Sequence, residues 1–173
     1  MPYDISVIRP EMRFEQVKPR GQGISPDRKS GIKKALNTLH TMEIMAATIY
    51  KCQITTKPCE LNTQLTAAMC NEMTHIQDFQ TKLYEYGFKP SKLRWTYWMV
   101  GYAFGLGSRL LGPRRILRTG IWVESKAVHH YAQLLVAVDW DEETRVFIEK
   151  DQADEHGHIE RWRRLLDGIG RGE

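Results

Sequence analysis

The stretch NEMTHI at residues 71–76 decides the fold, because its pattern returns near the other end of the chain as DEHGHI at residues 154–159. Each stretch holds a Glu-x-x-His unit within an otherwise apolar helical pattern. Residues three positions apart lie on nearly the same face of a helix, so each unit directs a carboxylate and an imidazole at one point. A single glutamate precedes each unit at a similar distance: Glu43 lies 29 positions before the glutamate of the first unit, and Glu124 lies 31 before that of the second. The pattern Glu…Glu-x-x-His therefore occurs twice in the chain.

The two halves together supply four carboxylates and two imidazoles, the ligand set of a carboxylate-bridged di-iron or di-manganese site in a four-helix bundle. Four uncompensated carboxylates on buried helix faces would repel one another and lose hydration, and two divalent cations remove that conflict. Oxygen-rich ligation with one imidazole per metal favours iron or manganese, whereas structural zinc sites favour thiolates. We therefore predict a site for two iron ions, with manganese as the alternative. Its ligands are Glu43, Glu72, His75, Glu124, Glu155 and His158.

Apolar residues at helical spacing predict an all-α protein, because every sustained period in the chain is close to 3.6 residues. Residues 1–28 hold four prolines and no sustained period, which indicates an N-terminal arm, and residues 29–173 form the predicted bundle domain. Ser25-Pro26 is a plausible helix start, with a polar cap and proline at the first helical position. The predicted helices cover about residues 29–55, 60–86, 93–111, 114–138 and 141–168.

A single Glu-x-x-His unit is weak evidence, since a chain of this composition produces such spacings by chance. A lone glutamate on an apolar face is more often a salt-bridge partner or a boundary residue. The weight comes from placement: all six candidate ligands replace apolar residues on stripes that otherwise read as core. A metal-free structural or partner-binding bundle is the remaining reading, and it requires these six residues to pair in some other way.

The segment of residues 93–111 is apolar nearly all round and rich in aromatic residues. Arg94 and Arg109 leave an uncharged run of 14 residues between them, short of the ~20 that a membrane-spanning helix needs. Further lysines and arginines flank it on both sides, which suits a helix lying in the interface of a membrane with anionic headgroups. A buried helix or a dimer interface, with Gly101, Gly105 and Gly107 permitting close approach, is an equal alternative.

Composition restricts the remaining possibilities. The 173 residues suffice for one domain with a substantial core, and a net charge of +4 is too small to argue for a nucleic-acid partner. The three cysteines, Cys52, Cys59 and Cys70, are odd in number and lack Cys-x-x-Cys spacing, which indicates reduced thiols. No charged region followed by an apolar one opens the chain, so we expect a cytoplasmic protein without a signal peptide.

Three residues near the candidate ligands draw separate hypotheses. Tyr131 lies seven positions beyond Glu124, about two helical turns, and therefore shares its stripe, whereas His130 borders that stripe. For this pair we consider three functional roles, which are a hydrogen bond to a ligand, proton delivery and electron relay. Simple packing is the structural alternative. Asp151 lies one turn before the second Glu-x-x-His unit and is placed to orient a ligand histidine through its second nitrogen.

The pattern resembles the demethoxyubiquinone hydroxylase family, a branch of the ferritin-like di-iron proteins, over residues 32–166. The likeness lies in Glu43-Ile44-x-Ala46-x-x-Ile49-Tyr50-x-x-Gln53, Glu72-x-x-His75, the glycine-rich stretch at 101–112, Val123-Glu124, His129-His130-Tyr131 and Asp154-Glu155-x-x-His158. The resemblance implies a ferritin-like bundle with the six residues above as iron ligands, Glu72 and Glu155 as bridges between the metals, and the pair His130-Tyr131 beside them as catalytic residues.

The resemblance also implies an activity: hydroxylation of the ring of a polyprenyl quinone precursor in ubiquinone biosynthesis, with NADH as reductant and dioxygen as co-substrate. It implies a peripheral protein of the inner, cytoplasmic membrane, bound through residues 93–111, and allows for a homo-oligomer or a lipid-binding helper protein. Met42 and Met45 stand where that family usually has glycines, which affects access to the site. The rival function is a ferritin-like di-iron oxidase, peroxidase or iron-handling protein, which would share the ligands and need no membrane face.

Overall fold

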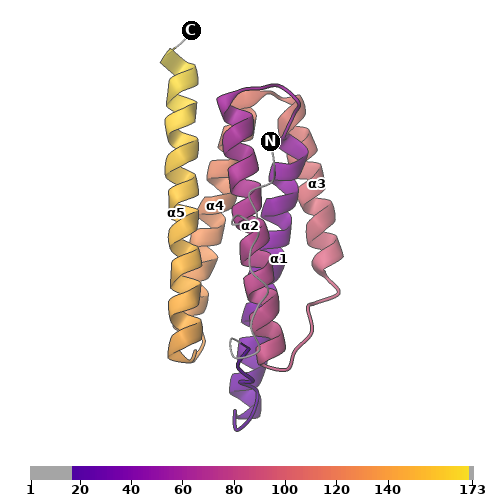
Figure 1. Cartoon of the computed structure of the whole chain (residues 1–173), viewed down its shortest axis with the longest axis vertical. Coiled ribbons are helices and arrows are strands. Elements are labelled where there is room, and N and C mark those ends of the chain that lie inside the picture. The colour runs from indigo at the N-terminus through magenta and orange to yellow at the C-terminus, as the bar shows by residue number, and fades with distance from the viewer. Residues whose placement is uncertain (1–16, 172–173) are drawn as a thin grey trace, which may run out of the picture.

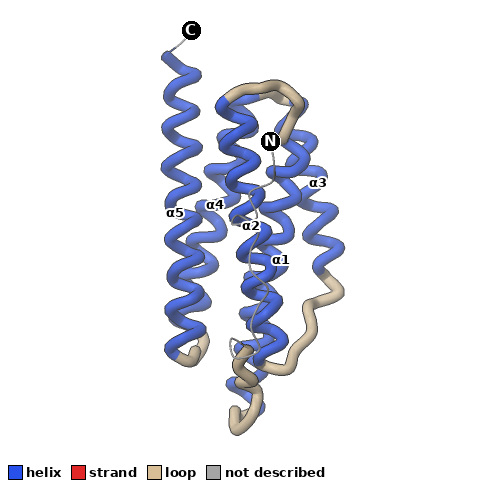
Figure 2. Tube along the Cα trace, in the orientation of Figure 1, coloured by secondary structure: helices blue, strands red, loops and turns tan. Residues whose placement is uncertain are grey.

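The computed structural model describes residues 17–171 of the chain, and these are helical with short connections. Five helices follow one another: α1 (Pro26–Gln53), α2 (Glu60–Glu85), α3 (Arg94–Leu110), α4 (Pro113–Ala137) and α5 (Glu142–Arg171). Among the described residues no strand occurs (Figure 2). The prediction of an all-α protein is confirmed, and each predicted helix is present with ends that differ by a few residues.

Local sequence signals account for the helix ends. Ser25 caps α1 by accepting a hydrogen bond from the backbone N–H of Arg28, and Pro26 opens the helix. At the end of α2, Gly87 adopts a φ of 75°, and the N–H of Phe88 reaches back to the carbonyl of Leu83 at 2.7 Å. This Schellman turn requires the left-handed conformation that glycine adopts without strain. It ends α2 sharply before the connection to α3.

Helices α1, α2, α4 and α5 form the bundle, and α3 lies outside it against α1 (Figure 1). Gly101 and Gly105 permit that contact, because a Cβ at either position would lie 2.6 or 2.7 Å from the carbonyl oxygens of Met45 and Ile49. Among residues 17–171, no helix is long and apolar enough to cross a membrane. The reading of this segment as a buried helix is not what the structure shows, because most of its large apolar side chains are exposed.

Two apolar clusters fill the two ends of the bundle. One joins the first half of α1 and the second half of α2 with residues such as Leu36, Phe79 and Tyr131. The other joins the opposite halves, with Leu65, Leu117 and Trp162 among its members. The candidate ligands lie between these clusters along every bundle helix. The core therefore consists of two apolar ends and a polar middle.

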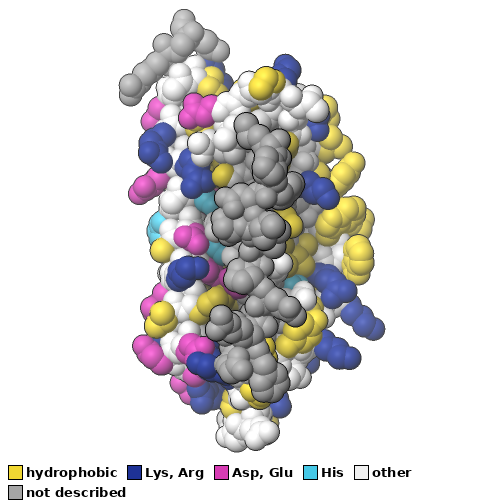
Figure 3. Space-filling view, viewed as in Figure 1, with side chains coloured by type: hydrophobic (Ala, Val, Ile, Leu, Met, Phe, Trp, Pro, Cys, Tyr) yellow, Lys and Arg dark blue, Asp and Glu magenta, His cyan; other side chains and the backbone are white. Residues whose placement is uncertain are grey.

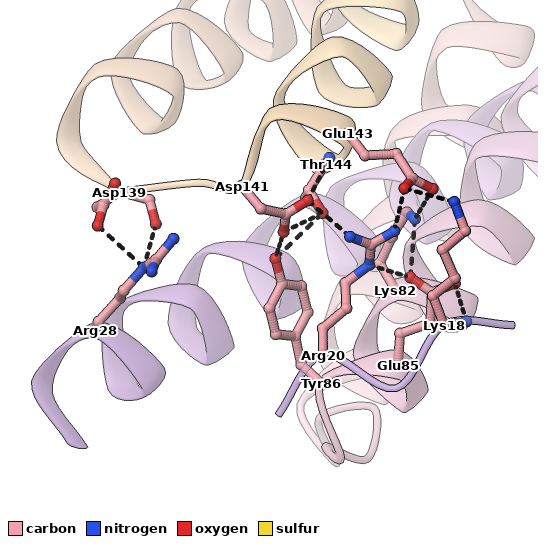
Figure 4. A network of polar contacts seen from close by, with 10 residues as sticks. All are labelled: Lys18, Arg20, Arg28, Lys82, Glu85, Tyr86, Asp139, Asp141, Glu143 and Thr144. Atoms are coloured by element: carbon pink, nitrogen blue, oxygen red, sulfur yellow. Dashed lines mark hydrogen bonds and ion pairs between the residues drawn. The ribbon is translucent and has the colours of Figure 1, made fainter. Parts of the chain in front are cut away.

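The segment before α1 is fixed by a group of ion pairs, shown in Figure 4. Arg20 contacts Glu85 at 2.8 Å, Asp141 at 2.8 Å and Glu143 at 2.7 Å, so it connects the end of α2 to the start of α5. Lys82 adds a second cation 2.9 Å from Glu85. We call this group the end clamp. The division into an arm of residues 1–28 and a bundle domain stays a prediction, and most of that arm, residues 1–16, lies outside the described residues.

Candidate metal centre

All four bundle helices bring polar side chains to the middle of the core. Helix α1 supplies Glu43 and α4 supplies Glu124, whereas α2 and α5 each supply a Glu-x-x-His unit. None of the six side chains is more than slightly accessible, the largest exposed fraction being 2%. Because all six face one another across the bundle, the structure brings together every residue that the sequence predicted as a ligand.

The six residues form two groups that share two carboxylates. One group consists of Glu43 and His75 together with Glu72 and Glu155, and the other of Glu124 and His158 together with the same two glutamates. Within each group the candidate ligand atoms lie within 4.8 Å of one another. A pair of shared carboxylates between two ligand groups is the arrangement of a dinuclear site.

The imidazoles lie at the centres of these groups. The Nδ1 atom of His75 is 3.1 Å from an oxygen of Glu155 and 3.7 Å from oxygens of both Glu43 and Glu72. The Nδ1 atom of His158 is 3.0 Å from Glu72, 3.3 Å from Glu155 and 3.6 Å from Glu124. Each imidazole thus presents one nitrogen to three carboxylates, which is how a metal-ligating histidine faces its ion.

Several buried polar atoms of these six residues make no hydrogen bond within the described part of the chain, which bears on whether the cluster fits a pair of cations. Among the described residues, both oxygens of Glu72 and of Glu155 lack a hydrogen-bond partner, as does the Nδ1 atom of each histidine. One oxygen of Glu124 is also unpartnered within residues 17–171. Buried polar atoms left without partners cost 1–3 kcal/mol each or more when charged, so native proteins rarely keep them together. Two divalent cations would satisfy this whole set.

The crowding of buried carboxylates and imidazoles also shifts the pKa values of the candidate ligands. Burial raises the pKa of Glu124 to about 8, with the charge of Glu155 adding to the effect. Burial also raises the pKa of Glu43 well above its usual range. For His158, burial alone would lower the pKa, but contacts with Glu124, Glu155 and Glu72 outweigh it and raise the pKa to about 12. Without metals, this cluster therefore holds protons where cations would otherwise sit.

The two residues predicted as catalytic occupy different positions. Tyr131 is buried, and its hydroxyl donates a hydrogen bond to Glu43 at 2.7 Å. His130 is exposed, with its Nδ1 atom 2.8 Å from the carbonyl oxygen of Lys126. It is one of the residues that line a cavity of about 400 Å³, which also borders Glu43 and which we call the ring cavity. Tyr131 therefore belongs to the centre, whereas His130 lines the cavity that borders Glu43, and a catalytic role for either stays a prediction.

An aspartate pair faces the second nitrogen of His75. Asp154 lies 3.2 Å from Nε2, and Asp151 lies 3.8 Å from it. Asp151, the predicted partner of a ligand histidine, is fully buried, but Asp154 is the closer of the two. An acceptor at Nε2 fixes the tautomer that presents Nδ1 to the carboxylates.

Sequence reasoning missed one buried group at the centre. The Tyr50 hydroxyl donates a hydrogen bond to Glu124 and accepts one from the indole nitrogen of Trp162 at 3.0 Å. The sequence spacing could have revealed Tyr50. It lies seven positions after Glu43, just as Tyr131 lies seven positions after Glu124. Only the second of these two tyrosines was recognised as a neighbour of the ligands.

Comparison with known proteins identifies the family. The family described as ubiquinone biosynthesis protein COQ7 matches residues 30–165, which include all six candidate ligands. The chain belongs to this family. A 3-demethoxyubiquinol 3-hydroxylase of Alcanivorax borkumensis is 25% identical over 142 residues, which cover 81% of this chain and 65% of the relative. The chain thus spans about 65% of the length of that curated relative. The resemblance noted in the sequence is confirmed.

Proposed function

We propose that this chain is a di-iron monooxygenase that hydroxylates the ring of a lipid-tailed quinone precursor in ubiquinone biosynthesis. The observation that carries the proposal is the pair of buried ligand groups that share Glu72 and Glu155. The fold is then a ferritin-like bundle with α3 as an added helix. Membership of the COQ7 family and the hydroxylase name of the relative supply the reaction type.

Each side chain has a task in this proposal. Glu43 and His75 would hold one iron and Glu124 and His158 the other, with Glu72 and Glu155 contributing to both. Bound ferrous ions supply the activation of dioxygen that ring hydroxylation requires. Dioxygen, two electrons and two protons convert a ring C–H into C–OH and water, and we propose NADH as the source of the electrons. Manganese fits the same oxygen-rich ligands and is the alternative metal.

The ring cavity supports a route for the substrate. It lies between α1, α3 and α4, and its lining includes Glu43, Met42, Met45 and Trp122. Apolar walls with a carboxylate at the inner end suit an aromatic ring that must approach a metal pair without much water. The two methionines line this route with flexible side chains, which can adapt to the ring that enters. His130 and Lys126 also line the cavity and can donate hydrogen bonds to ring oxygens.

A second cavity supports a place for the lipid tail. It has a volume of about 560 Å³ and is lined by Phe104, Leu111 and Trp122, with Arg115 and Arg118 also in its wall. Trp122 lines both cavities and stacks on Phe104 with ring centroids 5.6 Å apart. Because one side chain borders both spaces, a ring in the first cavity and a tail in the second can belong to one molecule.

The exposed face of α3 supports attachment to a membrane. Trp95 is 64% exposed and Leu110 77%, and apolar side chains gather along that edge of the molecule with lysines and arginines beside them (Figure 3). A large apolar patch rimmed by cations suits acyl chains and anionic headgroups. We therefore propose a peripheral protein on the cytoplasmic face of the inner membrane. A second copy or a lipid-binding helper protein is the competing occupant of this face.

Two measurements test the proposal. Anaerobically purified protein should contain two irons per chain and consume NADH and dioxygen faster when a short-chain demethoxyquinone is added. Loss of stimulation by quinone, with two irons present, would favour the oxidase or iron-handling alternative. In sedimentation with anionic liposomes, the wild type should pellet and the double change Trp95→Ser/Trp98→Ser should stay in solution. Tyr84→Ser, an exposed aromatic residue on α2, is the matched control and should pellet normally.

A further inference from the structure

Two tyrosines are placed reciprocally across the centre. Tyr50 follows Glu43 on α1 and Tyr131 follows Glu124 on α4, each by seven positions, or about two helical turns. Helices α1 and α4 run in opposite directions (Figure 1). Each tyrosine therefore reaches the glutamate of the other helix: Tyr131 donates to Glu43 at 2.7 Å, and Tyr50 donates to Glu124.

The two tyrosines differ in what holds them. The indole N–H of Trp162 donates to the Tyr50 hydroxyl at 3.0 Å, and the two rings lie 5.5 Å apart. Because that hydroxyl accepts from Trp162, its own proton is directed at Glu124. Gly120 on α4 makes room for the indole, since a Cβ there would lie 2.9 Å from the Trp162 ring. For Tyr131, the described part of the chain supplies no donor that corresponds to this indole.

The difference extends to the glutamates themselves. One oxygen of Glu124 accepts from Tyr50, and its other oxygen has no hydrogen-bond partner within residues 17–171. A carboxylate held in this way has a fixed orientation and one oxygen that makes no hydrogen bond to the described residues. Glu43, by contrast, lines the ring cavity and accepts from Tyr131. Within residues 17–171, the Tyr131 hydroxyl has no second partner like the indole of Trp162. The two ends of the centre are therefore unequal.

We propose that Tyr50 is a positioning residue that restricts Glu124 to binding its metal through one oxygen, and that Trp162 keeps Tyr50 in that orientation. The Glu124 half of the centre then keeps its geometry during turnover, and the Glu43 half, beside the cavity, is the one that rearranges. This inference rests on the proposed di-iron function. Tyr50 touches neither the cavity nor a reacting atom, so it acts through its glutamate.

Mössbauer spectra of protein loaded anaerobically with ⁵⁷Fe²⁺ test the proposal, with Tyr50→Phe and Tyr131→Phe as a matched pair. Each change removes one hydroxyl from the mirrored position and keeps the ring. We expect two quadrupole doublets in the wild type, a change in one of them in Tyr50→Phe, and a change in the other in Tyr131→Phe. Trp162→Phe should alter the same doublet as Tyr50→Phe by a smaller amount. Tyr50→Phe should also weaken binding of one iron roughly tenfold.

The outcomes separate this inference from the function on which it rests. An unchanged spectrum in Tyr50→Phe, or a change in the same doublet as in Tyr131→Phe, would overturn the assignment of Tyr50 while leaving the hydroxylase intact. Protein that binds no iron would overturn both proposals. Circular dichroism and thermal unfolding of each variant establish that the helices are retained, so a spectral change reports the centre and not a loss of fold.

Discussion

Two groups of carboxylates lie at different levels of the same bundle, and they are balanced differently. In the end clamp, Glu85 is buried against Arg20 and Lys82, both within 3 Å. In the middle, Glu72 and Glu155 are equally buried, and the neighbours that carry positive charge are imidazoles. The protein thus neutralises buried carboxylates with its own cations where it needs only stability. In the middle, two imidazoles face four carboxylates, so the described residues supply fewer cations than buried carboxylates there, which is the strongest physical argument that external cations belong in the middle.

Removing a shared carboxylate should have the largest effect. Glu72 belongs to both ligand groups, so we expect Glu72→Ala to lose at least one metal per chain and to reduce ring hydroxylation about a thousandfold or more, a loss of roughly 4 kcal/mol in transition-state stabilisation. Metal analysis and turnover with a short-chain quinone measure this. Glu85→Ala, in the end clamp, should keep both metals. Two metals in Glu72→Ala would contradict the shared role of this carboxylate.

Breaking the end clamp should affect stability and spare the metals. Arg20→Met leaves Glu85 buried with one cation fewer, and we expect the free energy of unfolding to fall by about 2–3 kcal/mol. Urea unfolding followed by circular dichroism gives the value. The variant should still bind two metals per chain, because Arg20 contacts none of the six candidate ligands. A loss of metal with no loss of stability would reverse the roles assigned to the two regions.

Neutralising a carboxylate should have opposite signs in the two regions. Because burial raises the pKa of Glu124 to about 8, its ionised form is unfavourable in the metal-free protein. Glu124→Gln should therefore stabilise the metal-free protein by about 1–3 kcal/mol, whereas Glu85→Gln should destabilise it. Chelator-treated protein in urea measures both. A destabilised Glu124→Gln would show that the middle carboxylates are balanced within the chain itself.

Much of the centre was predictable because a helix repeats on a short, regular period. Glu43 and Glu124 stand on apolar stripes, and the two Glu-x-x-His units share a face by their spacing alone. The same period placed Tyr131 at the centre. Tyr50 has the same spacing from Glu43 and was missed. Both tyrosines bond to a glutamate of the other helix, 74 and 88 positions away, and a pattern within one helix does not reveal these partners.

Two features were beyond sequence reasoning for physical reasons. The composition of α3 is the same whether its apolar surface meets protein or lipid, so only the structure shows that Trp95 and Leu110 are exposed. The segment before α1 has no period at all. Arg20 finds Glu85 and Asp141 at separations of 65 and 121 residues, through backbone geometry that no local pattern encodes.

Acid pH should reveal the smallest difference between the two regions. Hydrogen bonds from Arg20 and Lys18 lower the pKa of Glu143 to about 2 from its ordinary value of 4.5. Because the folded pKa lies below the unfolded one, the stabilisation is complete above about pH 4.5 and is lost as the pH falls toward 2. The Glu143 side chain is half exposed, so solvent limits its contribution to below about 1 kcal/mol. In metal-free protein, the free energy of unfolding should fall more steeply over this range in the wild type than in Arg20→Met. Equal slopes would mean that Arg20 does not hold Glu143 ionised.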